Sequence, residues 1–233
     1  MTTRQPFAPD ECYHVYNRGT EKRTIFQDPA DYDRFLALLY LSKGSDSIRL
    51  ENLRRREQGS TLLTAALECE IVSPRIAIGA YCLMPNHFHL LVRTTDERGL
   101  SEYMQKLTTA YTMYFNVKNG RTGALLQGRF KAEHAGQDRY LKYLFSYIHL
   151  NPVSLVEPGW QQAGLKDRRR AKRFLEGYRY SSYLDYQGSM RPENAILQPA
   201  AFPNYFDSGA LFQSHIDDWL EYRAGESGQG PTR

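Results

Sequence analysis

The chain has 233 residues, which is long enough for one domain with a buried core and a substantial extension. Its 30 Lys and Arg residues against 26 Asp and Glu give a formal net charge of +4, which favours a polyanionic partner but excludes the charge density of a histone-like protein. No run approaches the roughly 18 apolar residues that a membrane-spanning helix needs, and the N-terminus lacks an apolar signal core. We therefore expect a soluble, unprocessed protein.

The first elements are a strand and a helix. Residues 12–19, "CYHVYNRG", alternate around Val15 and stop at Gly19, which predicts a strand followed by a turn. The next segment has Asp28 as N-cap and Pro29 at the first helical position, so we predict a helix over about 29–43. Residues 44–70 carry charge blocks and Gly-Ser breaks, which indicate an insertion with room for one further helix.

A hairpin and three further elements follow. "RIAIGAYCLM" and "HFHLLVR" are β-rich runs that meet at Pro85 and Asn86, and they predict a central antiparallel hairpin. Residues 99–118 have apolar side chains at steps of three and four, which predicts an amphipathic helix. "ALLQGRFKAEHA" predicts a strand that is bent at Gly128. Residues 138–151 predict a helix that Pro152 ends. The order is strand, helix, hairpin, helix, strand, helix.

The remaining sequence has a different composition. A basic stretch at 166–173 precedes a tyrosine-rich one, and the last ten residues have a composition that is typical of disordered segments. We expect a domain at 1–153 with an insertion at 44–70, a C-terminal basic and tyrosine-rich extension at 154–223, and a disordered tail at 224–233. The three cysteines form no Cys-x-x-Cys pair, which fits a reducing cytoplasm rather than a disulfide framework.

His87 and His89 are two residues apart in a predicted strand, so their side chains point to the same face. Taken alone, this pattern is more often a pair of ordinary polar-face residues than a metal site. In the later helix, Tyr147 and Asn151 lie one turn apart, so a phenol oxygen and an amide oxygen could converge on one ion. Mixed nitrogen and oxygen ligands suit Mn²⁺ or Mg²⁺, which would leave positions for phosphate oxygens. These parts fit phosphoryl transfer.

With "NHFHLL" on a strand, "YLKYLFSYIHLNPV" on a later helix and "YHVYNRG" at the start, the sequence resembles the His-hydrophobic-His (HUH) single-strand DNA transposases. More narrowly it resembles the REP-associated tyrosine transposases, a bacterial branch related to the small insertion-sequence transposases. The resemblance runs from about Tyr13 to Val153, and "YRYSSYLDYQG" resembles a recurrent downstream element.

The resemblance implies an α+β, ferredoxin-like fold, with an antiparallel sheet and helices on one face, plus insertions and a C-terminal extension. It also implies that His87, His89 and Asn151 bind Mg²⁺ or Mn²⁺ and that Tyr147 is the nucleophile. The family cleaves and rejoins single-stranded DNA beside hairpins formed by palindromic repeats, through a 5′-phosphotyrosine. Relatives are monomers or homodimers, and we expect a cytoplasmic bacterial protein that is associated with the nucleoid when bound to DNA.

Several basic residues are candidate DNA contacts. They are Arg18, Arg129, Lys131, Arg169 and Arg170. The alternative is that these residues are ordinary solvated surface residues without a DNA contact. The spacing of Glu133, His134 and His14 gives none of them a catalytic role.

Two other functions remain open from the sequence. One is a non-catalytic, domesticated protein that binds DNA hairpins, and it predicts binding that is insensitive to chelators and to Tyr147→Phe. The other is a rolling-circle type nickase, although such proteins usually carry further domains.

Overall fold

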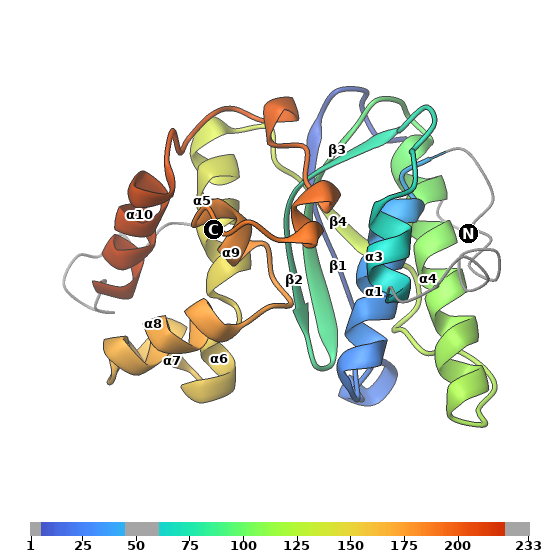
Figure 1. Cartoon of the computed structure of the whole chain (residues 1–233), viewed down its shortest axis with the longest axis horizontal. Coiled ribbons are helices and arrows are strands. Elements are labelled where there is room, and N and C mark those ends of the chain that lie inside the picture. Colours follow the sequence, from blue (N-terminus) through green and yellow to red (C-terminus); the bar gives the residue numbers. More distant parts are fainter. Residues whose placement is uncertain (1–5, 45–60, 222–233) are drawn as a thin grey trace.

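The computed structural model describes residues 6–44 and 61–221, and Figure 1 shows the arrangement of their helices and strands. The N-terminal elements are β1 (Cys12–Arg18), η1 (Thr20–Lys22), α1 (Pro29–Leu41) and α3 (Leu62–Leu67). The central elements are β2 (Ile76–Met84), β3 (His87–Thr94), α4 (Gly99–Lys118), β4 (Lys131–His134) and α5 (Asp138–Leu150). The C-terminal elements are α6 (Val153–Val156), α7 (Trp160–Ala163), α8 (Arg168–Gly177), α9 (Tyr183–Tyr186), η2 (Pro192–Ile196), η3 (Pro199–Ala201) and α10 (Gly209–Glu221).

The strands form one antiparallel sheet in the order β2-β3-β1-β4. The predicted hairpin is confirmed, because Met84 of β2 pairs with His87 of β3 across the two-residue turn Pro85-Asn86. The last strand is shorter than expected: the chain bends at Gly128, whose φ is +65°, and pairing with β1 starts only at Lys131. The α+β class with an antiparallel sheet is therefore confirmed.

Helices cover both faces of this sheet. Phe88, Leu90 and Val92 of β3 point to the core that also contains apolar residues of α1 and α4, as expected for helices on one face. Leu91 points the opposite way, into a second cluster with Leu144 and other apolar residues of α5. The expectation of helices on one face therefore holds for α1 and α4 but not for α5. The reason is that both faces of the hairpin strands carry apolar residues, and each face needs a cover.

Two predicted segments lie partly outside the described residues. Of the expected insertion at 44–70, residues 45–60 lie outside them, and 61–70 contain the short helix α3, which packs Leu63, Ala66 and Leu67 into the core of α1 and α4. The expected tail at 224–233 lies wholly outside the described residues.

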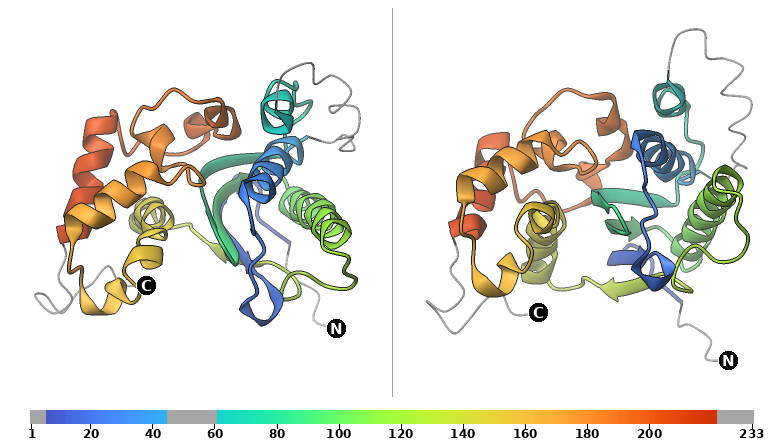
Figure 2. Two further views of the ribbon diagram at one scale, coloured as in Figure 1. Left: turned by 60° about the horizontal axis from the view of Figure 1, so that its bottom comes forward. Right: turned by 90° about the horizontal axis from the view of Figure 1, so that it is seen from below.

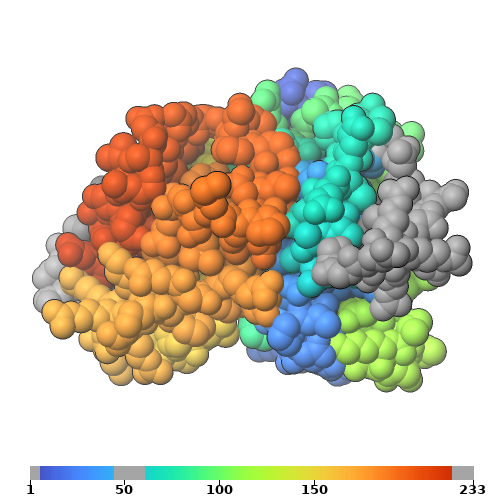
Figure 3. Space-filling model, in the orientation of Figure 1, coloured from blue at the N-terminus to red at the C-terminus, as the bar shows by residue number. Residues whose placement is uncertain are grey.

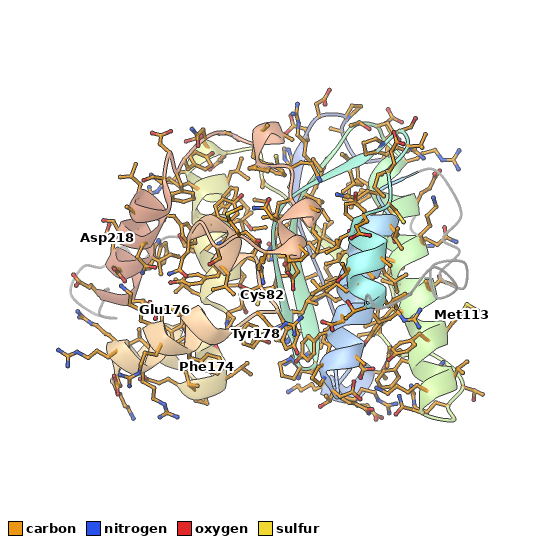
Figure 4. All side chains as sticks on the ribbon, viewed as in Figure 1. Cys82, Met113, Phe174, Glu176, Tyr178 and Asp218 are labelled. Carbon is orange, nitrogen blue, oxygen red and sulfur yellow. The ribbon has the colours of Figure 1, made fainter. Side chains whose placement is uncertain are left out.

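The C-terminal segment packs on α5 and closes the β2 edge of the sheet. Leu150 and Val153 share a buried cluster with residues of α8, α9 and α10, so the expected boundary at 153 falls inside a common core. The amide of Leu83 donates to the carbonyl of Tyr180, and the amide of Ser182 donates to that of Tyr81. The Tyr178 hydroxyl also donates to the carbonyl of Leu83. Figure 4 shows Tyr178 close to Cys82 on this edge.

Different views of the molecule agree on this layering. Figures 1 and 2 show α5 between the sheet and the C-terminal helices, while α1, α3 and α4 lie on the other side of the sheet. In Figure 3 the C-terminal segment lies directly beside α1 and α3. Tyr180 stacks on Tyr32 of α1 there, with 3.7 Å between the ring centroids. Among the helices of residues 6–44 and 61–221, none is long and apolar enough to cross a membrane.

Candidate active site

One face of three adjacent strands carries a band of polar side chains that points toward α5. In the antiparallel register Tyr16 is the partner of His89, and Arg18 is the partner of His87. Partners in an antiparallel pair point to the same face. On the other side of β1, Tyr16 pairs with Lys131, so β4 extends the same band.

His87 and His89 face each other at the centre of the band, with their ring centroids 5.1 Å apart. His89 is buried, with 6% of its surface exposed, and His87 is half-buried. The Nδ1 atom of His87 lies 2.6 Å from Oδ1 of Asn86, and the Nδ1 atom of His89 lies 2.9 Å from Nε2 of His14. Each ring is thus held through Nδ1, and Nε2 is the nitrogen that can bind a cation.

Tyr147 and Asn151 approach the histidines from the last turn of α5. The rings of Tyr147 and His89 meet edge to face with their centroids 5.4 Å apart. Nδ2 of Asn151 donates to the carbonyl of Tyr147 at 2.7 Å, and the Asn151 side chain also hydrogen-bonds to His87. Asn151 keeps helical φ and ψ of −51° and −42°, so the following Pro152 does not displace it from the stripe of Tyr147. The structure therefore brings all four predicted residues together.

The histidines are neutral near pH 7. Burial lowers the pKa of His87 to about 4; the charge of Arg18 acts in the same direction, and the hydrogen bond with Asn151 opposes both. Burial also holds the pKa of His89 well below its usual range, with His14, His87 and Arg18 acting in the same direction. A cation ligand must be deprotonated, so burial prepares both imidazoles to bind metal.

The donor set suits a hard divalent cation. Among the residues that the structure describes, no group of three or more His, Cys, Asp and Glu side chains could hold a metal. Of the three donors brought together here only two are residues of these types, both of them histidines, because the third is an amide. Nδ2 of Asn151 donates to the carbonyl of Tyr147, and its Oδ1 has lone pairs that can bind a cation. Two imidazole nitrogens and one amide oxygen are ligands that Mn²⁺ and Mg²⁺ accept.

Sequence reasoning gave no role to two groups that the structure places in the band. His14 contacts His89 and Tyr147, the latter with ring centroids 5.6 Å apart. Glu133 accepts hydrogen bonds from the hydroxyls of Tyr16 and Tyr140, and the first of these bonds is the main reason that its pKa is lowered. The alternation of "YHVYNRG" places His14 and Tyr16 on one face, but only the pairing with β3 shows that this is the face of His89.

The candidate DNA contacts fall into two groups. Arg18 and Lys131 lie on the polar band, where the Nζ atom of Lys131 is 5.8 Å from the ring centroid of Tyr16. Arg129 is exposed in the segment before β4. Arg169 and Arg170 are exposed on α8, which packs against α6 and α9. Only the first two are therefore beside the histidines by strand pairing.

His149 lies on the opposite side of α5 from Tyr147, as the helical spacing predicts. It is buried among C-terminal residues, and its Nε2 lies 2.7 Å from Oγ of Ser182.

Comparison with known proteins identifies the segment that carries this site. Residues 57–151 match the family model described as "Transposase IS200 like", a range that includes His87, His89 and Tyr147 and ends at Asn151. The resemblance to the IS200-like transposases is confirmed. A search of curated protein sequences finds no match for the chain.

A solved structure is also similar to the chain. It is described as "Structure of the REP associates tyrosine transposase bound to a REP hairpin". The two chains have 13% sequence identity and a TM-score of 0.45, and the similarity covers 83% of this chain and 90% of the other. The family match therefore supports a similarity to transposases over the segment that carries the candidate site.

Proposed function

We propose that the chain is a divalent-cation-dependent transposase that cleaves and rejoins single-stranded DNA beside hairpins through a 5′-phosphotyrosine. One observation carries the proposal. Tyr147 packs edge to face on His89 while Asn151, one helical turn later, bonds to His87. This packing supports the proposal, because it sets the Tyr147 phenol beside the residues that would hold the cation.

The reaction exchanges one phosphoester for another. The Tyr147 oxygen attacks the phosphorus, and a bond from this oxygen to phosphorus forms while the bond from phosphorus to the 3′ oxygen breaks. The phenol proton is transferred to the departing 3′ oxygen, so the products are a 5′-phosphotyrosine and a 3′-hydroxyl. Attack by a 3′-hydroxyl on the phosphotyrosine reverses the step and returns the proton to Tyr147. No nucleotide cofactor is needed, because the number of phosphoester bonds is unchanged.

His87, His89 and Asn151 would hold Mg²⁺ or Mn²⁺. The cation supplies positive charge for the phosphate oxygens. This matters because an ordinary tyrosine titrates near pH 10, so only about one phenol in a thousand is ionised at pH 7. The protein contributes two neutral imidazoles and a rigid placement of Tyr147, whose carbonyl is tied to Asn151.

The DNA would cross the polar band. Arg18 and Lys131 flank the histidines on the same sheet face and are suited to contact phosphates. Arg129, Arg169 and Arg170 are exposed and would contact DNA further from the cleaved bond. In this proposal the protein acts in the bacterial cytoplasm, as a monomer or a homodimer, and joins the nucleoid when it binds DNA.

Cleavage of labelled single-stranded hairpin DNA tests the proposal. With Mn²⁺, the wild-type chain should cleave at least one member of a broad hairpin panel, and EDTA or His89→Ala should abolish cleavage. His134→Ala is the matched control, because His134 is exposed and pairs with Tyr13, which points to the other sheet face. Cleavage that persists in EDTA, or that never occurs across the panel, contradicts the proposal.

A further inference from the structure

The contact between His14 and His89 is a buried bond between two imidazoles. Nε2 of His14 lies 2.9 Å from Nδ1 of His89, and the exposed fractions of the two residues are 4% and 6%. His14 lies in the middle of β1, which is hydrogen-bonded to β3 on one side and to β4 on the other. Its position is therefore fixed by two strand neighbours.

The direction of this hydrogen bond decides what His89 can do. A neutral imidazole carries one proton, so one ring donates and the other accepts. If His14 donates, the His89 proton is on Nε2, and that nitrogen has no lone pair for a cation. If His89 donates from Nδ1, its Nε2 has a free lone pair.

The neighbouring histidine shows which direction the site is built for. Nδ2 of Asn86 donates to the carbonyl of Lys22, so Oδ1 of Asn86 is the atom facing Nδ1 of His87. An amide oxygen only accepts, and therefore His87 carries its proton on Nδ1. His87 thus presents Nε2 to the centre of the site, and His89 needs an acceptor on its Nδ1 to do the same.

We propose that His14 is a positioning residue that accepts the Nδ1 proton of His89 and so presents the Nε2 lone pair of His89 to the divalent cation. This inference rests on the metal site of the proposed function. Polar partners of this kind fix the tautomer and orientation of metal-binding histidines, and their loss typically costs 10- to 100-fold in metal affinity.

The tautomer can be measured on the metal-free wild-type chain. Long-range proton–nitrogen NMR spectra of ¹⁵N-labelled protein distinguish the two ring nitrogens, and the His89 signals are assigned by their loss in His89→Ala. We expect the proton of His89 on Nδ1 and that of His14 also on Nδ1. A proton on Nε2 of His89 overturns the inference, and this result needs no His14 variant to fold.

The affinity for Mn²⁺, measured by electron paramagnetic resonance on the full chain, tests the consequence. His14→Phe keeps an aromatic ring against Tyr147 but has no acceptor, and it should weaken Mn²⁺ binding by roughly 10- to 100-fold. His14→Gln retains an accepting oxygen and should recover most of the affinity. His134→Phe, on the other sheet face, should bind as the wild type does, and thermal unfolding checks that each variant is folded.

The outcomes separate this inference from the proposed function. If Mn²⁺ binding depends on His89 but is unchanged in His14→Phe, the inference fails and the proposed metal site stands. If the wild-type chain shows no His89-dependent Mn²⁺ binding, the metal site fails, and the role of His14 fails with it.

Discussion

Asn151 is the residue that joins the two halves of the candidate site. Its amide nitrogen donates to the carbonyl of Tyr147, and its side chain also hydrogen-bonds to His87. A single side chain thus couples the position of the proposed nucleophile, Tyr147, to that of a proposed cation ligand, His87. Asn151 is the C-cap residue of α5 and is 7% exposed, so its side chain is held between the helix end and the histidines.

Substitutions of Asn151 test this double role. Asn151→Ala should lower Mn²⁺ affinity at least tenfold and abolish DNA cleavage, because it removes an oxygen ligand. Asn151→Asp keeps an oxygen donor and adds a negative charge, so it should bind Mn²⁺ at least as well as Asn151→Ala does. Titration calorimetry measures both affinities, and equal binding by wild type and Asn151→Ala contradicts the ligand assignment.

Sequence periodicity predicted part of the site and could not predict the rest. Strand alternation places His87 and His89 on one face, and helical spacing places Tyr147 and Asn151 on one stripe, so each pair follows from local geometry. The contact of His14 with His89 depends on the register between β1 and β3, and a shift of one residue would send His14 to the other face. Register is a property of the assembled sheet.

At the scale of elements, α5 is the part of the molecule on which the site depends. One side of it packs on the sheet through Leu144 and Phe145, and another packs on the C-terminal helices through Leu150. Because α5 also carries Tyr147 and Asn151, its packing sets the distance between the proposed nucleophile and the histidines.

Removing the packing of α5 should destabilise the protein strongly. Phe145 is 2% exposed, and its ring contacts those of Tyr186, Phe202 and Phe206. Phe145→Ala should lower the free energy of unfolding by about 3–5 kcal/mol, measured by urea denaturation. Met113→Ala is the control, since Met113 is 64% exposed on α4 (Figure 4) and its loss should cost less than about 0.5 kcal/mol. Similar losses in both variants would contradict the packing described for α5.

The elements themselves were largely predictable, whereas their layering was not. The hairpin with its Pro85-Asn86 turn and the helix over 99–118 follow from period-two and period-3.6 patterns. The placement of α5 opposite α1 and α4 depends on long-range packing, as does the closure of the β2 edge by residues 178–198. Short irregular segments that pair through backbone groups have no periodic signal.

At the scale of the whole molecule, Lys43 ties the N-terminal part to the C-terminal segment. It is 3% exposed, and its Nζ donates to the carbonyls of Ala195 and Ile196. Burial lowers the pKa of Lys43 to about 7. The unfolded chain, with an ordinary lysine pKa near 10.4, therefore binds more protons than the folded chain between about pH 7 and pH 10.

This difference predicts the pH dependence of stability. Below about pH 7 Lys43 is charged in both states, and the full cost of burying its charge lowers the free energy of unfolding. Between about pH 7 and pH 10 this cost is relieved, so the contribution of Lys43 to the free energy of unfolding rises by up to about 1.4 kcal/mol per pH unit. Urea denaturation of wild type and Lys43→Met between pH 7 and 8.5 isolates the effect, because the other groups titrate in both proteins. Equal slopes in the two proteins would show that Lys43 remains charged in the fold.

The basic surface of α8 should contribute to DNA binding through charge alone. Arg169→Ala and Arg170→Ala should each reduce the slope of log affinity against log salt concentration by about 1, as loss of one phosphate contact does. Arg98→Ala is a charge-matched control, since Arg98 is exposed and is the N-cap residue of α4, which packs on the other sheet face from α5. Unchanged slopes in both α8 variants would remove this helix from the DNA path.

Mapping the covalent protein–DNA adduct tests the central claim most directly. Wild-type protein incubated with Mn²⁺ and a cleaved hairpin substrate is digested with protease and nuclease, and the nucleotide-bearing peptide is sequenced by mass spectrometry. We predict a 5′-phosphate linked to Tyr147, a free 3′-hydroxyl on the released strand, and no adduct in Tyr147→Phe, while Tyr143→Phe still forms it. An adduct on another residue, or an adduct that survives in Tyr147→Phe, would contradict the assignment of Tyr147 as the nucleophile.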